Sequence, residues 1–210
     1  PIAQGPLLQL DYVGCKASMF SFVRLGKADP ILGVEMASTG EVGVFGRNKH
    51  KVFLKAMIAA KFEYPRRSVL LSIDDAEQTI AFIPWIRLLS KKLVLYATSF
   101  TAAILRGSGV ACNIAQGPDN AHVEPNVMTL LKKRELSLVI QLRDKTHDFL
   151  LRRQREETAS QDYKIRRLAT DFNTPLITEI RLAELMAEAL DKYDVRDMED
   201  RKSTRLNSSH

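Results

Sequence analysis

The chain has 210 residues, a hydrophobic fraction of 45% and a formal net charge of +6 at pH 7. This hydrophobic fraction is ordinary for a globular protein, and the chain is long enough to bury a core. No apolar run approaches the roughly 20 residues that cross a bilayer, so no membrane partner is expected. The start, PIAQGPLLQL, lacks the basic region of a signal peptide, and none is expected.

The positive charge is weak evidence for nucleic-acid binding, because part of it lies at the very end of the chain. The stretch KSTRLNSSH back-translates to a string that resembles a common sequencing adapter, so we interpret residues 200–210 as an artificial tail. That tail has three basic residues and one acidic residue, a net of +2, which leaves +4 for the other 199 residues. No basic stripe with interleaved aromatic residues stands out, so no nucleic-acid partner is expected.

The first part of the chain differs in character from the rest. Residues 1–50 are rich in glycine and short strand-like runs, and DYVGCKASMFSFVRL alternates as a partly buried strand pair would. KVFLKAMIAAK, residues 51–61, has helical spacing, and a break follows at EYPRR. We interpret residues 1–60 as the edge of a mixed α+β domain and residues 61–199 as a second domain.

From residue 68 onward, short apolar runs alternate with helical stretches. The runs predicted as strands are SVLLSI, KLVLYA, VACNIA, LSLVIQL and TPLITEI. The first helical stretch, AEQTIAFIPWIRLLS, contains Pro84, which we expect near its first turns, and the last is RLAELMAEALDKY. This alternation predicts an α/β fold with a five-stranded parallel sheet and helices on both faces.

Three loops should meet at one edge of that sheet. Ligands of open parallel sheets bind beyond the carboxyl ends of the strands, where the strand order reverses. Residues 72–78, 98–101 and 141–146 follow three predicted strands. Thr98 and Thr101 stand three apart at a helix start, where their hydroxyls and free backbone N–H groups can face one anion. In the simpler alternative, Thr98 only caps the helix.

Other candidate residues are open to simple structural interpretations. Arg166 and Arg167 either contribute to a site or form a solvated helical face. His147 lacks partners at triad or metal spacing and is expected on the surface. Phe82 and Trp85, three apart on a helix, are expected in the core. The two cysteines, Cys15 and Cys112, lack metal-type spacing and are expected to be buried free thiols in a reducing compartment.

Several stretches, taken together, resemble a single family. FSFVRL, ADPILGVEM and STGEV resemble the end of the second ATP-grasp unit of the carbamoyl phosphate synthetase large subunit. LLSI, YATSFT, LVIQL and IRRLATDFNTPLI resemble the C-terminal regulatory domain of that enzyme, which is methylglyoxal-synthase-like. The resemblance covers essentially residues 11–193. It implies that residues 1–60 are the end of an ATP-grasp domain and residues 61–199 a methylglyoxal-synthase-like allosteric domain.

The resemblance implies a regulatory fragment that is inactive alone. The family makes carbamoyl phosphate from bicarbonate, glutamine or ammonia, and two ATP, for pyrimidine or arginine synthesis. Its metal-binding and nucleotide-binding residues lie upstream, so no catalytic residue, metal or cofactor is expected in this chain. ATP, magnesium and potassium are implied only for the parent enzyme. The implied partners are the rest of the synthetase chain and its glutaminase, in the cytoplasm or, alternatively, in mitochondria.

An effector site is also implied by the resemblance. Thr98 and Thr101 match two effector-contacting threonines of the family, and Ser72 matches a serine after the first strand. The predicted effector-binding residues are Ser72, Thr98, Thr101, Gln141, Arg143 and Arg166.

The sequence also departs from the family pattern. Gln78 stands where bacterial relatives carry lysine, Gly117 stands near a lysine or tryptophan position, and Gln141 replaces an asparagine. Asp162 stands where the N-acetylglutamate type has an asparagine. Its carboxylate would repel an acidic ligand, so a uridine nucleotide is favoured over N-acetylglutamate.

Two other functions stay open at this point. One is a stand-alone methylglyoxal synthase, a phosphate lyase that needs a base and a histidine near the phosphate. His147 and Asp148 imitate the His-Asp pair of that enzyme, but its Gly-Gly-Asp turn is missing from QGPDNAHVE. The other is a non-regulatory interaction module, which the sequence does not separate from a regulatory domain.

Overall fold

The computed structural model describes residues 11–19, 40–120, 122–142 and 161–198. Near the start of the chain, β1 (Val13–Met19) pairs antiparallel with β2 (Gly40–Gly46) in a two-stranded sheet. The first half of DYVGCKASMFSFVRL thus forms a strand whose partner is β2, and its second half lies outside the described residues. The helix α1 (Lys49–Ala59) follows β2 and contacts both strands.

The second sheet has five parallel strands, as the sequence predicts. They are β3 (Ser68–Ile73), β4 (Val94–Ala97), β5 (Asn113–Ile114), β6 (Leu138–Leu142) and β7 (Leu176–Ile177). Their order in the sheet is β5-β4-β3-β6-β7. From β3, the next strands along the chain, β4 and β5, are added on one side of it. The later strands, β6 and β7, are added on its other side. The topological switch point therefore lies between β3 and β6.

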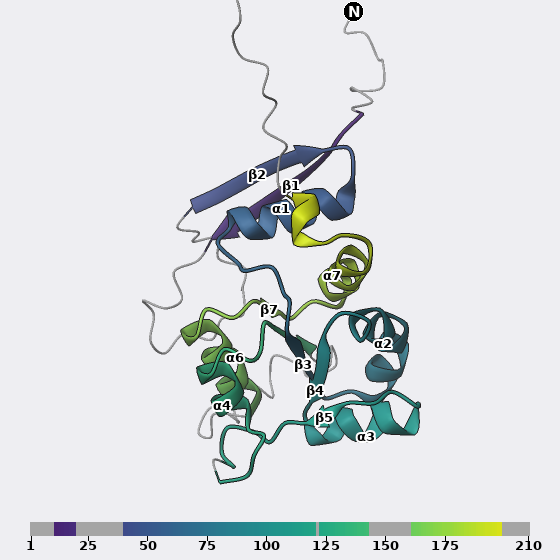
Figure 1. Cartoon of the computed structure of the whole chain (residues 1–210), viewed down its shortest axis with the longest axis vertical. Coiled ribbons are helices and arrows are strands. Elements are labelled where there is room, and N and C mark those ends of the chain that lie inside the picture. Colours follow the sequence, from purple (N-terminus) through teal and green to yellow (C-terminus); the bar gives the residue numbers. More distant parts are fainter. Residues whose placement is uncertain (1–10, 20–39, 121, 143–160, 199–210) are drawn as a thin grey trace, which may run out of the picture.

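Helices cover both faces of this sheet, which confirms the predicted architecture (Figure 1). On one face lie α2 (Ala76–Leu89), α3 (Ser99–Gly107) and α7 (Ile180–Lys192). On the other face lie α4 (Val127–Lys132) and α6 (Gln161–Asp171). A short 3-10 helix, η2 (Val195–Met198), follows α7. Burial on both faces is the physical reason that SVLLSI is almost uniformly apolar.

Local signals explain where several helices begin and end. Asp75 caps α2 by accepting a hydrogen bond from the amide of Gln78, and Asn126 caps α4 by accepting one from the amide of Met128. Past the end of α3, Gly109 adopts φ = 70°, a left-handed conformation that favours glycine. These short-range contacts are of the kind that a sequence predicts well.

Pro84 is placed differently from the prediction. It lies well inside α2 rather than near the first turns, so the helix lacks one backbone hydrogen bond to the carbonyl of Ile80. Pro84 is exposed, whereas Phe82 and Ile86 are fully buried. The proline therefore faces away from the core, and packing of the opposite face holds the helix together. Phe82 stacks on Trp85, with 5.9 Å between ring centroids, which confirms the predicted core pair.

The helix α1 lies between the two sheets (Figure 1). It contacts β1 and β2 on one side, and its Phe53 and Leu54 share a core with Met186 and Leu190 of α7 on the other. The predicted domain boundary at residue 60 stays a prediction. Within the described part of the chain, no helix has the length and apolar character needed to span a bilayer.

Candidate functional site

The candidate site lies at the carboxyl ends of β3 and β6. Ser72 and Gln141 are opposite each other in the register of these two strands, and each is 1% exposed. Successive side chains of a strand point to opposite faces of the sheet. The neighbours of Ser72 and Gln141 along their strands face α2 and α7, so these two side chains belong to the face covered by α4 and α6. The prediction that Gln141 follows its strand is wrong, because β6 continues to Leu142. The two polar side chains therefore lie beside the topological switch point.

Arg166 reaches this position from α6. Its Nη1 donates to Oε1 of Gln141 at 3.2 Å, and Nε2 of Gln141 donates to the carbonyl of Asp162 at 3.3 Å. Arg166 is 2% exposed, so the alternative of a solvated helical face is wrong for this residue. Its neighbour Arg167 pairs with Asp171 at 2.6 Å. The guanidinium of Arg166 brings a buried positive charge to this edge of the sheet.

The two threonines lie at the same edge, toward the face that carries α2 and α3. Thr101 is fully buried; its Oγ1 accepts from the amide of Ile73 at 2.9 Å and donates to the carbonyl of Ile73 at 3.1 Å. Oγ1 of Thr98 lies 3.0 Å from Oγ1 of Thr101. Thr98 stands at the N-cap position but makes no side-chain cap hydrogen bond. The alternative that Thr98 simply caps the helix with its hydroxyl is therefore wrong.

The direction of the hydrogen bond between the two threonine hydroxyls follows from the number of their protons. A hydroxyl has one proton and two acceptor sites. Because Thr101 gives its only proton to the carbonyl of Ile73, Thr98 must donate to Thr101. Thr101 is then fully satisfied and holds α3 to the end of β3, while Thr98 keeps free acceptor capacity. The backbone N–H groups of the first turn of α3 receive no cap from Thr98 and suit an anion.

The remaining sequence candidates fall in several places. Arg143 and His147 lie outside the described residues. Gln78 is in the first turn of α2. Gly117 lies against Gln161, whose side chain would contact any Cβ at residue 117. The structure thus brings Ser72, Gln141 and Arg166 together, and separately Thr98 and Thr101; their role in binding an effector stays a prediction.

The cysteines and possible metal ligands of the described ranges do not gather in one cluster. Cys15 and Cys112 are both free, and each is half-buried rather than fully buried as predicted. Burial raises the pKa of both thiols, which disfavours the reactive thiolate. No three His, Cys, Asp or Glu side chains gather as metal ligands within residues 11–19, 40–120, 122–142 and 161–198.

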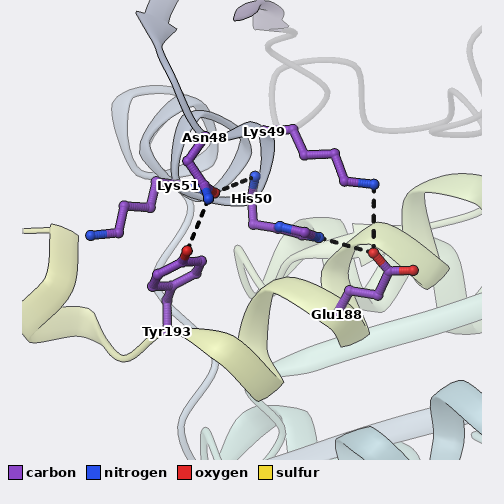
Figure 2. Close-up of polar contacts among 6 residues, drawn as sticks. All are labelled: Asn48, Lys49, His50, Lys51, Glu188 and Tyr193. Carbon is purple, nitrogen blue, oxygen red and sulfur yellow. Dashed lines mark hydrogen bonds and ion pairs between the residues drawn. The ribbon is translucent and has the colours of Figure 1, made fainter.

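Sequence reasoning missed a polar network between α1 and α7, drawn in Figure 2. Oδ1 of Asn48 caps α1, and its Nδ2 donates to the hydroxyl of Tyr193 at 2.9 Å. Nε2 of His50 lies 2.9 Å from Oε2 of Glu188, and Nζ of Lys49 lies 3.7 Å from the same oxygen. Asn before a helical run signals a cap. No local signal points to partners 138 and 145 residues away along the chain.

Comparison with known proteins finds a family model that matches the middle of the chain. Residues 81–178 match the family described as MGS-like domain. A solved methylglyoxal synthase from Elizabethkingia anophelis NUHP1 is also similar, with 19% identity and a TM-score of 0.41, over 58% of this chain and 77% of that one.

The chain as a whole is similar to parts of much longer proteins. It is 38% identical over 200 residues to the multifunctional protein pyrABCN of Emericella nidulans, covering 92% of this chain and 9% of that protein. It is 36% identical over 208 residues to the multifunctional protein URA2 of Saccharomyces cerevisiae, covering 96% and 9%.

The human mitochondrial carbamoyl-phosphate synthase [ammonia] is 34% identical over 195 residues, covering 91% of this chain and 12% of that enzyme. The expected resemblance to carbamoyl phosphate synthetases is thus confirmed. The chain spans about a tenth of the length of these relatives.

Proposed function

We propose that the chain is the regulatory segment of a carbamoyl phosphate synthetase and that its MGS-like domain binds a small anionic effector. One observation carries the proposal: the buried guanidinium of Arg166 reaches Gln141, opposite Ser72, at the switch point of the sheet. Ligands of such sheets bind at this point. A guanidinium matches the oxygens of phosphate or carboxylate groups better than any other side chain.

A uridine nucleotide is the favoured effector, and N-acetylglutamate is placed second. The phosphate of a nucleotide would lie near the first turn of α3, where backbone N–H groups attract it, and the positive charge of Arg166 stands at the same edge of the sheet. Asp162 stands in the first turn of α6, and its carbonyl already contacts Gln141. The carboxylate of Asp162 at this position disfavours the two carboxylates of N-acetylglutamate.

The synthesis of carbamoyl phosphate from bicarbonate, glutamine or ammonia, and two ATP is assigned to the longer parent protein. ATP, magnesium and potassium belong there, as does the glutaminase partner. The parent is placed in the cytoplasm, with mitochondria as the alternative.

Exposed aromatic residues on β1–β2 support contact with the rest of that chain. Phe45 is 69% exposed, and Tyr12, at 47%, meets it edge-on with 5.7 Å between ring centroids. Apolar surface of this kind typically packs against a partner.

The test is thermal denaturation of the whole chain with UMP, UTP, IMP or N-acetylglutamate at millimolar concentration. A ligand at about 100 times its Kd adds roughly 2.7 kcal/mol, which raises Tm by several degrees. We expect a shift with a uridine nucleotide that Thr98→Ala abolishes. The control Ser90→Ala removes a hydroxyl at the opposite edge of the sheet, beside the end of α2, and should keep the shift. No shift with any of the four compounds would overturn the proposed effector.

A further inference from the structure

The helix α7 connects two distant parts of the molecule. It begins at Ile180, shortly after β7 ends at Ile177, so its first turn lies at the carboxyl edge of the sheet, where the candidate site is. Its 13 residues span about 20 Å. Its far end lies against α1, next to the β1–β2 sheet (Figure 1). One continuous helix therefore extends from the edge that carries the candidate site to the first part of the chain.

At this far end, Glu188 makes several directional contacts. Its Oε2 lies 2.9 Å from Nε2 of His50 and 3.7 Å from Nζ of Lys49 (Figure 2). The bond to His50 is the largest cause that lowers the pKa of the Glu188 carboxyl, and the neighbouring Trp85 and Lys49 lower it further. His50 is only 5% exposed, whereas the side chain of Glu188 is 33% exposed, so water screens their contact in part.

Tyr193 fixes the end of α7 in a second way. Its hydroxyl accepts from Nδ2 of Asn48 at 2.9 Å, and its carbonyl accepts from the hydroxyl of Tyr64 at 2.6 Å. Nζ of Lys51 lies 4.9 Å from the centre of its ring (Figure 2). Hydrogen bonds have narrow preferred ranges of donor–acceptor distance and angle. A small shift of α7 along its axis therefore changes its contacts with the first turn of α1.

The packing of α1 between α7 and the β1–β2 sheet allows a shift of α7 to displace that sheet as well. Phe53 and Leu54 share a core with α7, while the other side of α1 contacts β1 and β2. Closely packed elements move as bodies rather than deform continuously. A displacement of α1 therefore moves the β1–β2 sheet with it.

We propose that the α1–α7 network of Asn48, His50, Glu188 and Tyr193 is a conformational relay between the candidate effector site and the β1–β2 sheet. The proposal rests on the proposed function, because the relay would report whether that site is occupied. An effector that binds two arrangements of α7 with different affinity shifts α1 by at most that difference in binding free energy. Such coupling typically amounts to about 5–150-fold in affinity.

Hydrogen–deuterium exchange of the whole chain, with and without UMP, tests the relay. In the wild type, UMP should slow exchange both in the first turn of α3 and in α1. The double variant Glu188→Gln with Tyr193→Phe keeps size and packing but removes one charge and one hydroxyl. It should keep the thermal shift and the protection of α3, and lose the protection of α1.

The control is Asp191→Asn, which breaks a surface ion pair of the same helix with Lys91, at 2.8 Å, and leaves the network intact. It should behave as the wild type does. Protection of α1 that persists in the double variant, or that is missing from the wild type while α3 is protected, would overturn the relay. Loss of the thermal shift and of α3 protection together would instead count against the proposed function.

A second exchange experiment, without any ligand, tests the relay even when no nucleotide binds. Ala183 is fully buried in the first turn of α7, and Ala183→Gly loosens that turn. Exchange of the α1 amides should then rise about fivefold, the factor that corresponds to a Gly-for-Ala change in a helix. The same change made in the Glu188→Gln, Tyr193→Phe background should add no further rise in α1. An equal rise in both backgrounds would show that α7 does not act through the network.

Discussion

Thr101→Val keeps the shape of the side chain but removes the hydroxyl that joins α3 to the end of β3. That hydroxyl is fully buried and bonds to the amide of Ile73 at 2.9 Å, to its carbonyl at 3.1 Å and to Thr98 at 3.0 Å. Without it, both backbone groups of Ile73 lose their contact with α3. Valine therefore tests the hydrogen bonds with little change in packing.

The expected loss follows from these contacts. A buried polar group left without a partner costs about 1–3 kcal/mol, so two backbone groups give roughly 2–6 kcal/mol. This is a large part of the roughly 5–15 kcal/mol that stabilises a typical domain. The control Thr101→Ser keeps the hydroxyl and loses one methyl group, which costs about 1 kcal/mol.

Urea denaturation measures both variants. We expect the midpoint to fall much further for valine than for serine, with unchanged slopes, since a change of midpoint alone reports stability. If valine proves as stable as serine, the hydroxyl does not hold Ile73, and the direction assigned to the Thr98–Thr101 bond falls with it.

Two further predictions concern pH and a helix. Burial, and then the carboxylates of Asp194 and Asp197, raise the pKa of Tyr64 to about 12, so the folded chain favours the neutral phenol. Its contribution to stability is complete below pH 10 and is lost as the pH rises toward 12; the free energy of unfolding should therefore fall more steeply above pH 10 than in Tyr64→Phe, and equal slopes would contradict this. Pro84→Ala restores the missing helix donor and should stabilise the chain by about 1–2 kcal/mol in urea denaturation, whereas a loss of stability would show that the proline supports α2.

The sequence by itself determined the elements and the type of sheet. β3 and β6 were predicted because strands buried on both faces read as short apolar runs, here SVLLSI and LSLVIQL. Alternation with helices then required parallel strands, and parallel strands place their loops at one edge. Ser72 could be singled out because it stands near the end of β3, and Thr98 and Thr101 because they follow β4. The match to an MGS-like domain agrees with the family resemblance.

Only the tertiary structure decided what each of these side chains contacts. Periodicity tells which face of an element is buried, but it does not tell which residue lies opposite. That depends on strand register and helix placement, which bring Arg166 onto Gln141 and the hydroxyl of Thr101 onto the backbone of Ile73. The same holds for His50 and Glu188, which lie 138 residues apart in the chain and 2.9 Å apart in space. Such pairs form because the folded core brings α1 and α7 together, and no local pattern in the sequence encodes them.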